Sequence, residues 1–596
     1  MNTAQFYTSR AESYKSQYET FKKRETYWAF ARLFAFIGLI AIIFTGFSIS
    51  EVVGIISIFP SLAAFGFVIN RHLKIVKEKE RNQYLYEINL AEIACLQGNY
   101  SMFANGSEYN EKEHPYLNDL DILGTHSLYQ YINRTNTQPG AATLAEWLKR
   151  PAAYSEISKR QDAVKELASQ TDWRQTLRSV FYINPSSTNN PDKLTAWCNS
   201  PSEFKQKERL RIILWITSCA ILGSTVLWML NFPSVWLSIT ILISFAINYA
   251  YIKRINNIQT NLSKSYAMLE SYADIIKLIE QGHFESKKLI DLKSKLNSDI
   301  SASIILKQLS RLSKKLDYRL NLLIGLPLNL FFLWDIHQCL KLKKWKTKNR
   351  DKIDSWFIAM AEFEALSSLA NLYFNNPSWA LPEVTDDYFH LSMKEAGHPL
   401  IPAEKRILND FTINNEIKIA LVTGSNMSGK STFLRTCGVN IILAMAGAPV
   451  CAEKFSVSHV HIYSSMRIAD SLEENTSSFY AELKKLAQII KVVEQKERVF
   501  LLLDEILRGT NSNDRHTGSV ALIRQLIKNN APGIIATHDL ALSSLTEEHG
   551  KNIDVYNFDV KIQDEELYFD YKINRGICKS LNASILMKKM GIEINP

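Results

Sequence analysis

The sequence predicts a multidomain chain in which helical membrane hairpins and an all-α core precede a C-terminal α/β domain. Two long stretches carry almost no charge. Residues 256–375 repeat Leu, Ile, Lys and Glu at helical spacing, and short β-branched strands alternate with helices after about residue 385. The 596 residues are 46% hydrophobic and 22% charged, which excludes a disordered chain and allows large packed cores.

The overall charge is mildly basic, because 69 Lys and Arg against 60 Asp and Glu give +9. This balance permits a nucleic-acid or anionic-lipid partner without requiring one. The seven cysteines are scattered and form no CxxC pair. A disulfide framework and a zinc site are therefore disfavoured, and a reducing compartment is favoured.

The first uncharged stretch covers residues 33–69 and is long enough for two helical spans. A helix needs about 20 apolar residues to cross a bilayer. The only charged residue in the stretch is Glu51, at a short turn expected near Ser48–Glu51. Arg32 precedes the stretch and Arg71 follows it. A cleaved signal peptide is disfavoured, because the apolar run begins far beyond a normal n-region.

The second uncharged stretch covers residues 212–252, with a turn expected near Asn231–Pro233. Arg211 precedes it and Lys253 follows it, so both hairpins carry their basic residues on the outer flanks. The positive-inside rule then places both termini and the large soluble segments in the cytoplasm, and the chain in the cytoplasmic membrane as a multi-pass protein. The alternative is that the four helices are two buried hairpins in a soluble core.

Two further segments need an interpretation. The apolar run Leu322–Trp334 contains Pro327 and is about 13 residues long, which predicts a buried helix in place of a fifth span. The basic run at residues 341–352 predicts a solvated helix face, with contact to phosphates or lipid headgroups as the functional alternative.

The strongest local pattern follows a strand predicted over residues 417–423. The sequence from Gly424 to Thr432 reads GSNMSGKST, which is G-x4-G-K-[ST] between a strand and a helix. Glycines at both ends let backbone N–H groups surround phosphates, and the helix N-terminus adds partial positive charge. Lys430 would reach the β- and γ-phosphates, and the Ser431 hydroxyl would ligate Mg²⁺.

Two more strand ends carry polar side chains suited to the same chemistry. The predicted strand at residues 498–504 ends in Asp504 and Glu505, and the predicted strand at residues 532–537 is followed by His538. Ligand chemistry in an open α/β sheet lies at the carboxyl ends of the strands. Asp504 would hold Mg²⁺, Glu505 would orient the attacking water, and His538 would contact the γ-phosphate. This order is similar to the ABC-type ATPase core.

These motifs resemble those of the DNA mismatch-repair MutS family. TGSNMSGKST resembles its TGPNMGGKST loop, LLLDEILRGTNSNDRHTG its DEIGRGTSTxDG segment, and IIATHDLAL its FATHYHEL segment. EAGHPLI resembles the start of the family's ATPase domain, and YKINRGICKSLNASILMKKMGI its end. Residues 124–167 and 358–384 resemble parts of the family's helical core, including a T-x-x-G turn.

The resemblance implies three regions. They are a region with the first hairpin (1–118), a helical core and lever domain interrupted by the second hairpin (119–384), and an ABC-type ATPase domain (385–596). The sequence departs from the family in leaving no segment for the mismatch-recognition domain and no evident clamp. Leu507 stands where the motif has Gly, and an aromatic that would stack adenine is not obvious near Arg406 and Ile407.

The resemblance also implies the residues of an ATP site. Catalysis would rest on Lys430, Glu505 and His538, and Mg²⁺ would bind Ser431 and Asp504. Ser477 or Ser478 would cap the ATP of a partner subunit, which implies a homodimer, while Arg467 and Arg508 would either link nucleotide to the interface or form structural ion pairs. The residues expected around ATP are Gly424, Ser425, Asn426, Met427, Ser428, Gly429, Lys430, Ser431, Thr432, Ser477 and Ser478.

Three functions are compatible with these features. The first is a membrane-anchored MutS-like ATPase that binds double-stranded DNA and acts in mismatch repair or DNA metabolism. The second is a MutS-type ATPase repurposed to drive a conformational change of the membrane hairpins or a protein partner without DNA. The third, an ABC-type transporter, is least favoured because four spans are few and the LSGGQ signature is absent.

Overall fold

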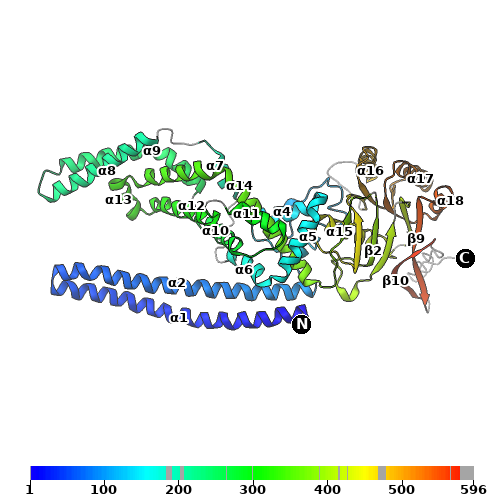
Figure 1. Cartoon of the computed structure of the whole chain (residues 1–596), viewed down its shortest axis with the longest axis horizontal. Coiled ribbons are helices and arrows are strands. Elements are labelled where there is room, and N and C mark those ends of the chain that lie inside the picture. Colours follow the sequence, from blue (N-terminus) through cyan, green and yellow to red (C-terminus); the bar gives the residue numbers. More distant parts are fainter. Residues whose placement is uncertain are drawn as a thin grey trace.

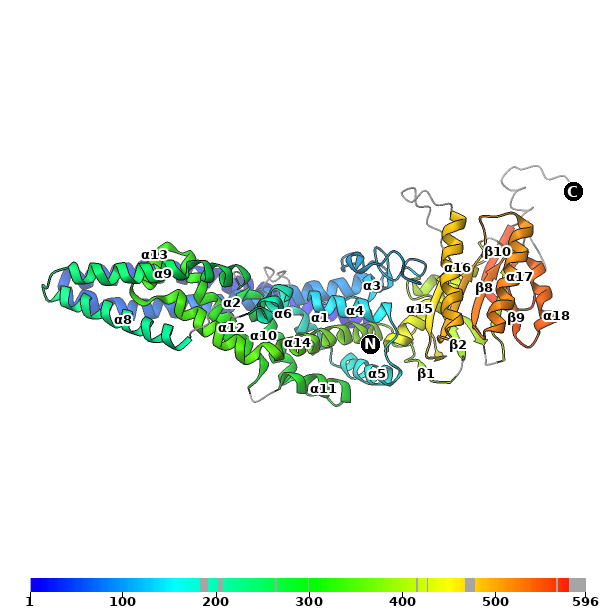
Figure 2. The same cartoon turned by 90° about the horizontal axis from the view of Figure 1, so that it is seen from above.

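The computed structural model describes residues 2–182, 191–201, 207–262, 265–297, 300–387, 389–413, 416–425, 427–466, 478–563 and 566–577. The molecule is elongated (Figures 1 and 2). Helical hairpins form one end, a helical core lies in the middle, and an α/β domain forms the other end.

The first hairpin consists of two long antiparallel helices, α1 (Thr3–Ile49) and α2 (Glu51–Leu96). Ser50 separates them in an extended conformation, and its hydroxyl accepts a hydrogen bond from the Val53 N–H at 3.2 Å, which caps α2. The turn predicted from the charge pattern is therefore confirmed. The helices extend well beyond the apolar stretch, so the hairpin continues alongside the helical core (Figure 1).

The second hairpin consists of α8 (Lys207–Met229) and α9 (Val235–Leu262), joined at the predicted turn. Both hairpin turns lie at the same end of the molecule, away from the α/β domain (Figure 1). By length and composition, α1, α2, α8 and α9 could each cross a membrane, and at most 22% of the most apolar window of any of them is buried. These helices are thus not the interior of a soluble core within one chain.

The third apolar run corrects a prediction. It forms the short helix α13 (Leu322–Phe332), but its apolar side chains are not buried. Leu322 is 74% exposed and Leu323 is 87% exposed, and Gly325 is the one buried residue of the helix. The length of the run indicated a helix too short for a span, but length alone cannot show whether a helix is covered by protein. Here α13 lies beside the exposed second hairpin instead of inside the core.

The helical core surrounds one long helix, α14 (Trp334–Asn375). It begins beside α13, and α4, α5, α11 and α12 pack along it. The basic run at residues 341–352 lies on α14 mainly as an exposed face, as predicted, although Lys346 is buried with its ammonium over the Trp197 ring. The other core helices are α3 (Leu128–Ile132), α4 (Gln138–Lys149), α5 (Tyr154–Ser169), α6 (Thr171–Tyr182), α7 (Pro191–Asn199), α10 (Tyr266–Gln281), α11 (Lys287–Leu296) and α12 (Ala302–Leu316).

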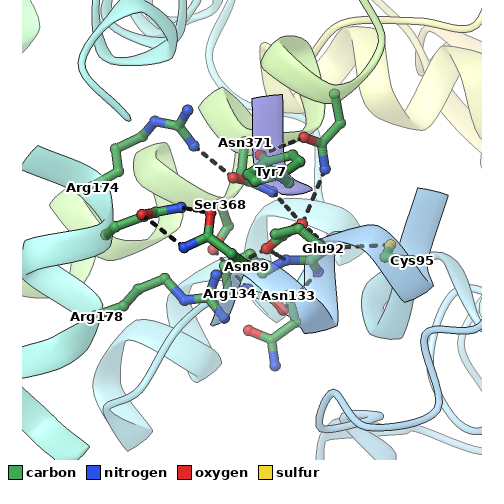
Figure 3. A network of polar contacts seen from close by, with 12 residues as sticks. Tyr7, Asn89, Glu92, Cys95, Asn133, Arg134, Arg174, Arg178, Ser368 and Asn371 are labelled. Atoms are coloured by element: carbon green, nitrogen blue, oxygen red, sulfur yellow. Dashed lines mark hydrogen bonds and ion pairs between the residues drawn. The ribbon is translucent and has the colours of Figure 1, made fainter. Parts of the chain in front are cut away.

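A buried ionic cluster joins the first hairpin to the core (Figure 3). The side chain of Glu92, on α2, is 1% exposed and forms ion pairs with Arg134 at 2.7 Å and Arg178 at 2.9 Å. Burial alone would raise the pKa of Glu92. The charge and hydrogen bonds of Arg134, with the charge of Arg178, outweigh burial and lower that pKa to about 2. Glu92 therefore stays ionised inside the protein.

The same cluster reaches α14 and α1 (Figure 3). The side-chain amides of Asn371 and Asn375 each donate to Glu92 Oε2 at 3.0 Å. The Tyr7 hydroxyl, on α1, donates to Asn375 Oδ1 at 2.7 Å. Both helices of the first hairpin are thus tied to the end of α14 nearest the α/β domain.

The α/β domain contains two sheets. The larger has the strand order β10-β9-β4-β8-β7-β6, in which only β10 and β9 pair antiparallel, so the predicted mostly parallel sheet is confirmed. The smaller sheet, of order β1-β5-β2-β3, was not predicted. The strands are β1 (Glu383–Thr385), β2 (Leu391–Ala396), β3 (Asn409–Ile413), β4 (Ile419–Gly424), β5 (Lys454–Ser458), β6 (His461–Ser465), β7 (Val499–Asp504), β8 (Gly533–Thr537), β9 (Ile553–Gln563) and β10 (Glu566–Arg575).

Helices cover both faces of the larger sheet. Side chains alternate along each strand, so Ala420 and Val422 of β4 join the core shared with α15, while Ile419 and Leu421 join a second core formed with α16 and α17. The helices are α15 (Lys430–Ala446), α16 (Ser478–Glu494), α17 (Ser512–Lys528) and α18 (Leu545–His549). The domain bounds at residues 118 and 384 stay predictions.

Candidate nucleotide site

The register of the parallel strands brings the three predicted segments to one edge of the sheet. Thr423 pairs with Thr537 between β4 and β8, and Asp504 pairs with Ala536 between β7 and β8. The loop after β4, the acidic pair at the end of β7 and the histidine after β8 therefore lie next to one another. Strand-end residues separated by up to 114 positions thus form one site.

The loop between β4 and α15 requires glycine at both ends. Gly424 has φ +148°, and a Cβ there would lie 2.9 Å from the carbonyl oxygen of Phe558 and from Ser428 Oγ. Gly429 has φ +107° and is the N-cap of α15. This backbone directs the N-terminus of a 17-residue helix at the loop, an arrangement that favours anions. Met427, in the middle, is 74% exposed and has φ +65°.

Lys430 is held over this loop by the loop itself. Its ammonium donates to the carbonyl oxygens of Gly424 at 2.9 Å and Ser425 at 2.8 Å, and the residue is 4% exposed. The charge of this ammonium also acts on the neighbouring carboxylates of Asp504 and Glu505. A lysine ammonium at the N-terminus of a helix, behind a glycine-bounded loop, suits a phosphate anion.

Asp504 and Ser431 face each other across the site. Burial raises the pKa of Asp504, and a hydrogen bond from Ser431 and the charges of Arg508 and Lys430 oppose that effect. Among the described residues, Asp504 Oδ1 is buried without a hydrogen-bond partner. A hydroxyl and a carboxylate with a spare oxygen fit the hard-oxygen ligands that Mg²⁺ prefers. The two residues predicted to hold Mg²⁺ therefore lie next to each other, and their role as ligands stays a prediction.

Glu505 lies between a histidine and an arginine. Its carboxylate pairs with His538 Nε2 on one side and with Arg508 Nε at 2.7 Å on the other. The hydrogen bond from His538, helped by the charges of His538 and Arg508, lowers the pKa of Glu505. The carboxylate is therefore ionised near neutral pH and can accept a hydrogen bond from water. Arg508 forms this ion pair within the chain, and a link between nucleotide and a dimer interface stays a prediction for it.

The loop after Glu505 is strained, and a buried acid stabilises it. Leu507 has φ +61°, a left-handed conformation that glycine adopts at lower cost than leucine, and Leu507 stands where the motif that this segment resembles has Gly. The Leu507 N–H donates to the carboxylate of Glu482, on α16. Glu482 was missed by sequence reasoning, because a Glu in an amphipathic helix gives no sign that it binds a distant loop.

Several other residues bear on the sequence predictions. Tyr571, on β10, was not predicted, yet its ring would lie 3.1 Å from a Cβ on Gly429, so it is an aromatic neighbour of the loop. Arg406, near the place expected for an adenine-stacking residue, instead binds the carbonyl oxygen of Ile401. Asn426, Arg467 and Ser477 lie outside the described residues, and Ser478 is described only as the first residue of α16. The residues brought together are Gly424, Ser425, Met427, Ser428, Gly429, Lys430, Ser431, Thr432, Asp504, Glu505 and His538.

The fold and the site define a class of protein, namely an α/β protein with a glycine-bounded anion loop and an acidic pair at the neighbouring strand end. Residues 420–590 match the family MutS domain V. The DNA mismatch repair protein MutS of Ehrlichia ruminantium (strain Gardel) is 33% identical over 232 residues, which is 38% of this chain and 28% of that protein.

Other relatives match to a similar extent. The DNA mismatch repair protein MutS of Persephonella marina is 29% identical over 250 residues, which is 41% of this chain and 28% of that protein. MutS protein homolog 4 of Mus musculus is 31% identical over 215 residues, which is 34% of this chain and 22% of that protein. Over this part of its sequence the chain is therefore similar to MutS proteins. It spans less than a third of the length of the curated relatives it matches.

Proposed function

We propose that the chain is a Mg²⁺-dependent ATPase of the MutS family, anchored in the cytoplasmic membrane by its two helical hairpins. The observation that carries the ATPase assignment is the arrangement of Lys430, Asp504 and Glu505 at one sheet edge. Loop glycines and Lys430 would bind the phosphates, and Ser431 and Asp504 would hold Mg²⁺, which would supply charge neutralisation when bound.

The proposed hydrolysis rests on orientation and charge. Glu505 holds the attacking water, while His538 and Arg508 keep the Glu505 carboxylate in place. Lys430 stabilises the charge that develops on the transferred phosphoryl group. Ser477 or Ser478 of one subunit would complete the site of the other, so the active form is a homodimer with composite sites.

Anchoring in the membrane is supported by the exposed apolar surface. Four helices are apolar and almost uncovered over span-length windows, and both hairpin turns lie at the end opposite the α/β domain (Figures 1 and 2). A soluble monomer rarely exposes so large an apolar surface. With basic residues at the outer flanks, the ATPase domain and both termini would lie in the cytoplasm.

The first candidate activity is a DNA-linked one. The curated relatives are named for DNA mismatch repair, and an exposed basic face on α14 is available for phosphate contacts. ATP-driven closure of a dimer would bring two such helices toward a duplex. Mismatch specificity would need a recognition element that none of these residues supplies.

The second candidate is a membrane-directed ATPase without DNA, and the buried ionic cluster favours it. That cluster joins both helices of the first hairpin to α14, which ends at the α/β domain. A movement of the ATPase domain would therefore reach the hairpin, or a protein partner bound to it.

The test is the ATPase rate of the full chain in nanodiscs, with and without duplex DNA at several salt concentrations. Lys430→Ala should abolish hydrolysis. Lys528→Ala should not, because Lys528 ends α17 just before β8 begins, at the opposite end of the strands from the site. Normal hydrolysis by Lys430→Ala would refute the site. DNA stimulation that fades steeply with salt would support the first candidate. An ATPase rate that does not change with DNA would support the second candidate. Comparing mismatched with perfectly paired duplex would test mismatch recognition.

A further inference from the structure

The short helix α13 exposes a concentrated apolar surface to its surroundings. Its exposed side chains belong to Leu322, Leu323, Ile324, Leu326 and Phe332, with exposed fractions from 45% to 87%. Five large apolar residues on eleven positions form a patch that water would disfavour. The patch is continuous with the second hairpin, because α13 packs against both α8 and α9.

Polar side chains of α9 donate hydrogen bonds to backbone carbonyls of α13. Ser244 Oγ donates to the carbonyl oxygen of Leu330 at 2.8 Å, and Asn248 Nδ2 donates to that of Asn329 at 3.0 Å. Ser244 is fully buried although it lies in the middle of an uncharged stretch. The Asn329 carbonyl also accepts from the Leu333 N–H at 3.1 Å, so α9 adds a second donor there and supplies a donor to the Leu330 carbonyl in the last turn of α13.

The break between α13 and α14 is also satisfied internally. Leu333 has φ +48° and turns the chain, so the two helices meet at 82°. The side chain of Asn329 accepts from the Asp335 N–H at 3.0 Å and donates to the carbonyl oxygen of Gly325 at 3.0 Å. A helix break within hydrocarbon requires such internal partners, because lipid offers none. In water the same groups would need no partner within the protein, because solvent would bind them.

The contacts with α9 set the depth of α13. Ser244 and Asn248 precede Lys253, the first charged residue after the uncharged stretch, by nine and five residues. At 1.5 Å per residue, they lie about 13 Å and about 7 Å inside that stretch. Half of the hydrocarbon core is about 15 Å thick. The end of α13 therefore lies at the level of one lipid leaflet.

The chain enters and leaves α13 from the same side of the membrane. The preceding helix α12 packs against α14, which follows α13, so the chain returns to where it came from. An 11-residue helix is about 16 Å long, too short to cross a core of about 30 Å. Resting on the proposed membrane anchoring, we propose that α13 is embedded in the cytoplasmic leaflet without crossing the bilayer and that lipid acyl chains cover its exposed face.

The flanks of α13 carry the residue types of a membrane boundary. Tyr318 stacks on Trp334, whose indole N–H donates to the carbonyl oxygen of Lys315 at 2.8 Å. Amphipathic aromatics of this kind concentrate at headgroup level. The basic run begins at Lys341, eight residues into α14 and about 12 Å along it, where anionic headgroups would meet its exposed face.

The test is the accessibility of nitroxide probes on the full chain in vesicles of zwitterionic and anionic phospholipid. The background is Cys219→Ala with Cys578→Ala, since the other five cysteines are buried. Leu323→Cys places a probe on α13, Leu242→Cys one on α9, and Ile290→Cys one on α11 of the helical core. All three residues are at least 47% exposed, so the probes leave the packing intact.

The expected result is that probes at Leu323 and Leu242 collide with oxygen and are protected from a water-soluble nickel complex, while the probe at Ile290 is not. Protection at Leu242 with nickel access at Leu323 would overturn this inference and leave the anchoring intact. Nickel access at Leu242 would overturn the anchoring as well. If the Leu323 probe is shielded from both reagents and broadened by a second nitroxide, another copy of the chain covers α13, and the lipid assignment is wrong.

Discussion

The Glu92 cluster provides a sharp test of how the first hairpin is attached. Glu92→Gln keeps the shape of the side chain and removes its charge, which leaves Arg134 and Arg178 without their counter-ion. Their side chains are 3% and 11% exposed, so water cannot replace the carboxylate. Breaking one partner of a buried ion pair costs about 3–5 kcal/mol.

The pKa of Glu92 gives an independent estimate. Its lowering from 4.5 to about 2 corresponds to about 3 kcal/mol of stability at neutral pH. Because the folded-state pKa is depressed, this stability is present above pH 4.5 and is lost as the pH falls toward 2. The stability gap between wild type and Glu92→Gln should therefore narrow across that window.

The assay is amide hydrogen exchange of the full chain in nanodiscs. In Glu92→Gln, peptides covering residues 85–96 and 364–375 should exchange about 150-fold faster at neutral pH, the equivalent of about 3 kcal/mol. The control is Glu25→Gln, which removes a partly exposed ion pair with Lys79 in the same hairpin and should cost under about 1 kcal/mol. Equal effects of the two variants would refute the conclusion that the cluster fixes the hairpin to α14.

Three other variants test neighbouring features. Burial raises the pKa of Glu364 to about 7, so the folded protein holds the proton more tightly than the unfolded chain, and the free energy of unfolding falls as the pH rises from 4.5 through 7. Glu364→Gln should remove this fall, measured as the difference in unfolding free energy between pH 5 and pH 8.5. Gly140→Ala would place a Cβ 2.0 Å from Glu364 Oε2, and calorimetry should show a loss of about 1–3 kcal/mol. Arg508→Gln removes one charge that lowers the pKa of Glu505, so the acidic limb of the ATPase pH profile should move to higher pH.

The sequence was informative where a feature is local. The uncharged stretches located both hairpins and their turns, and the loop from Gly424 to Thr432 located the strand–helix junction. The meeting of Glu505 and His538 followed from the rule that parallel strands end at one edge. The T-x-x-G turn is also explained, because Thr137 caps α4 through the Gly140 N–H at 2.9 Å.

The sequence was uninformative where a feature depends on distant partners. Glu92 contacts Asn375, 283 residues away. The local sequence pattern around each of them is that of a polar residue on the surface of a helix. The smaller sheet pairs short strands out of chain order. The exposure of α13 depends on what surrounds it, which an 11-residue apolar run with a proline does not specify.

The long helix α14 connects the parts that any ATP-driven movement would involve. Its first turn lies beside α13 and the second hairpin, its last turns bind the first hairpin through Asn371 and Asn375, and the chain enters the smaller sheet at β1 soon afterwards. Sliding the first hairpin along α14 would separate charges held in a buried site, at a cost of several kcal/mol. The hairpin and α14 therefore move as one body. A movement produced at the nucleotide site must bend the chain between Asn375 and β1 or shift α4 and α5 over α15, and either movement would displace both hairpins together.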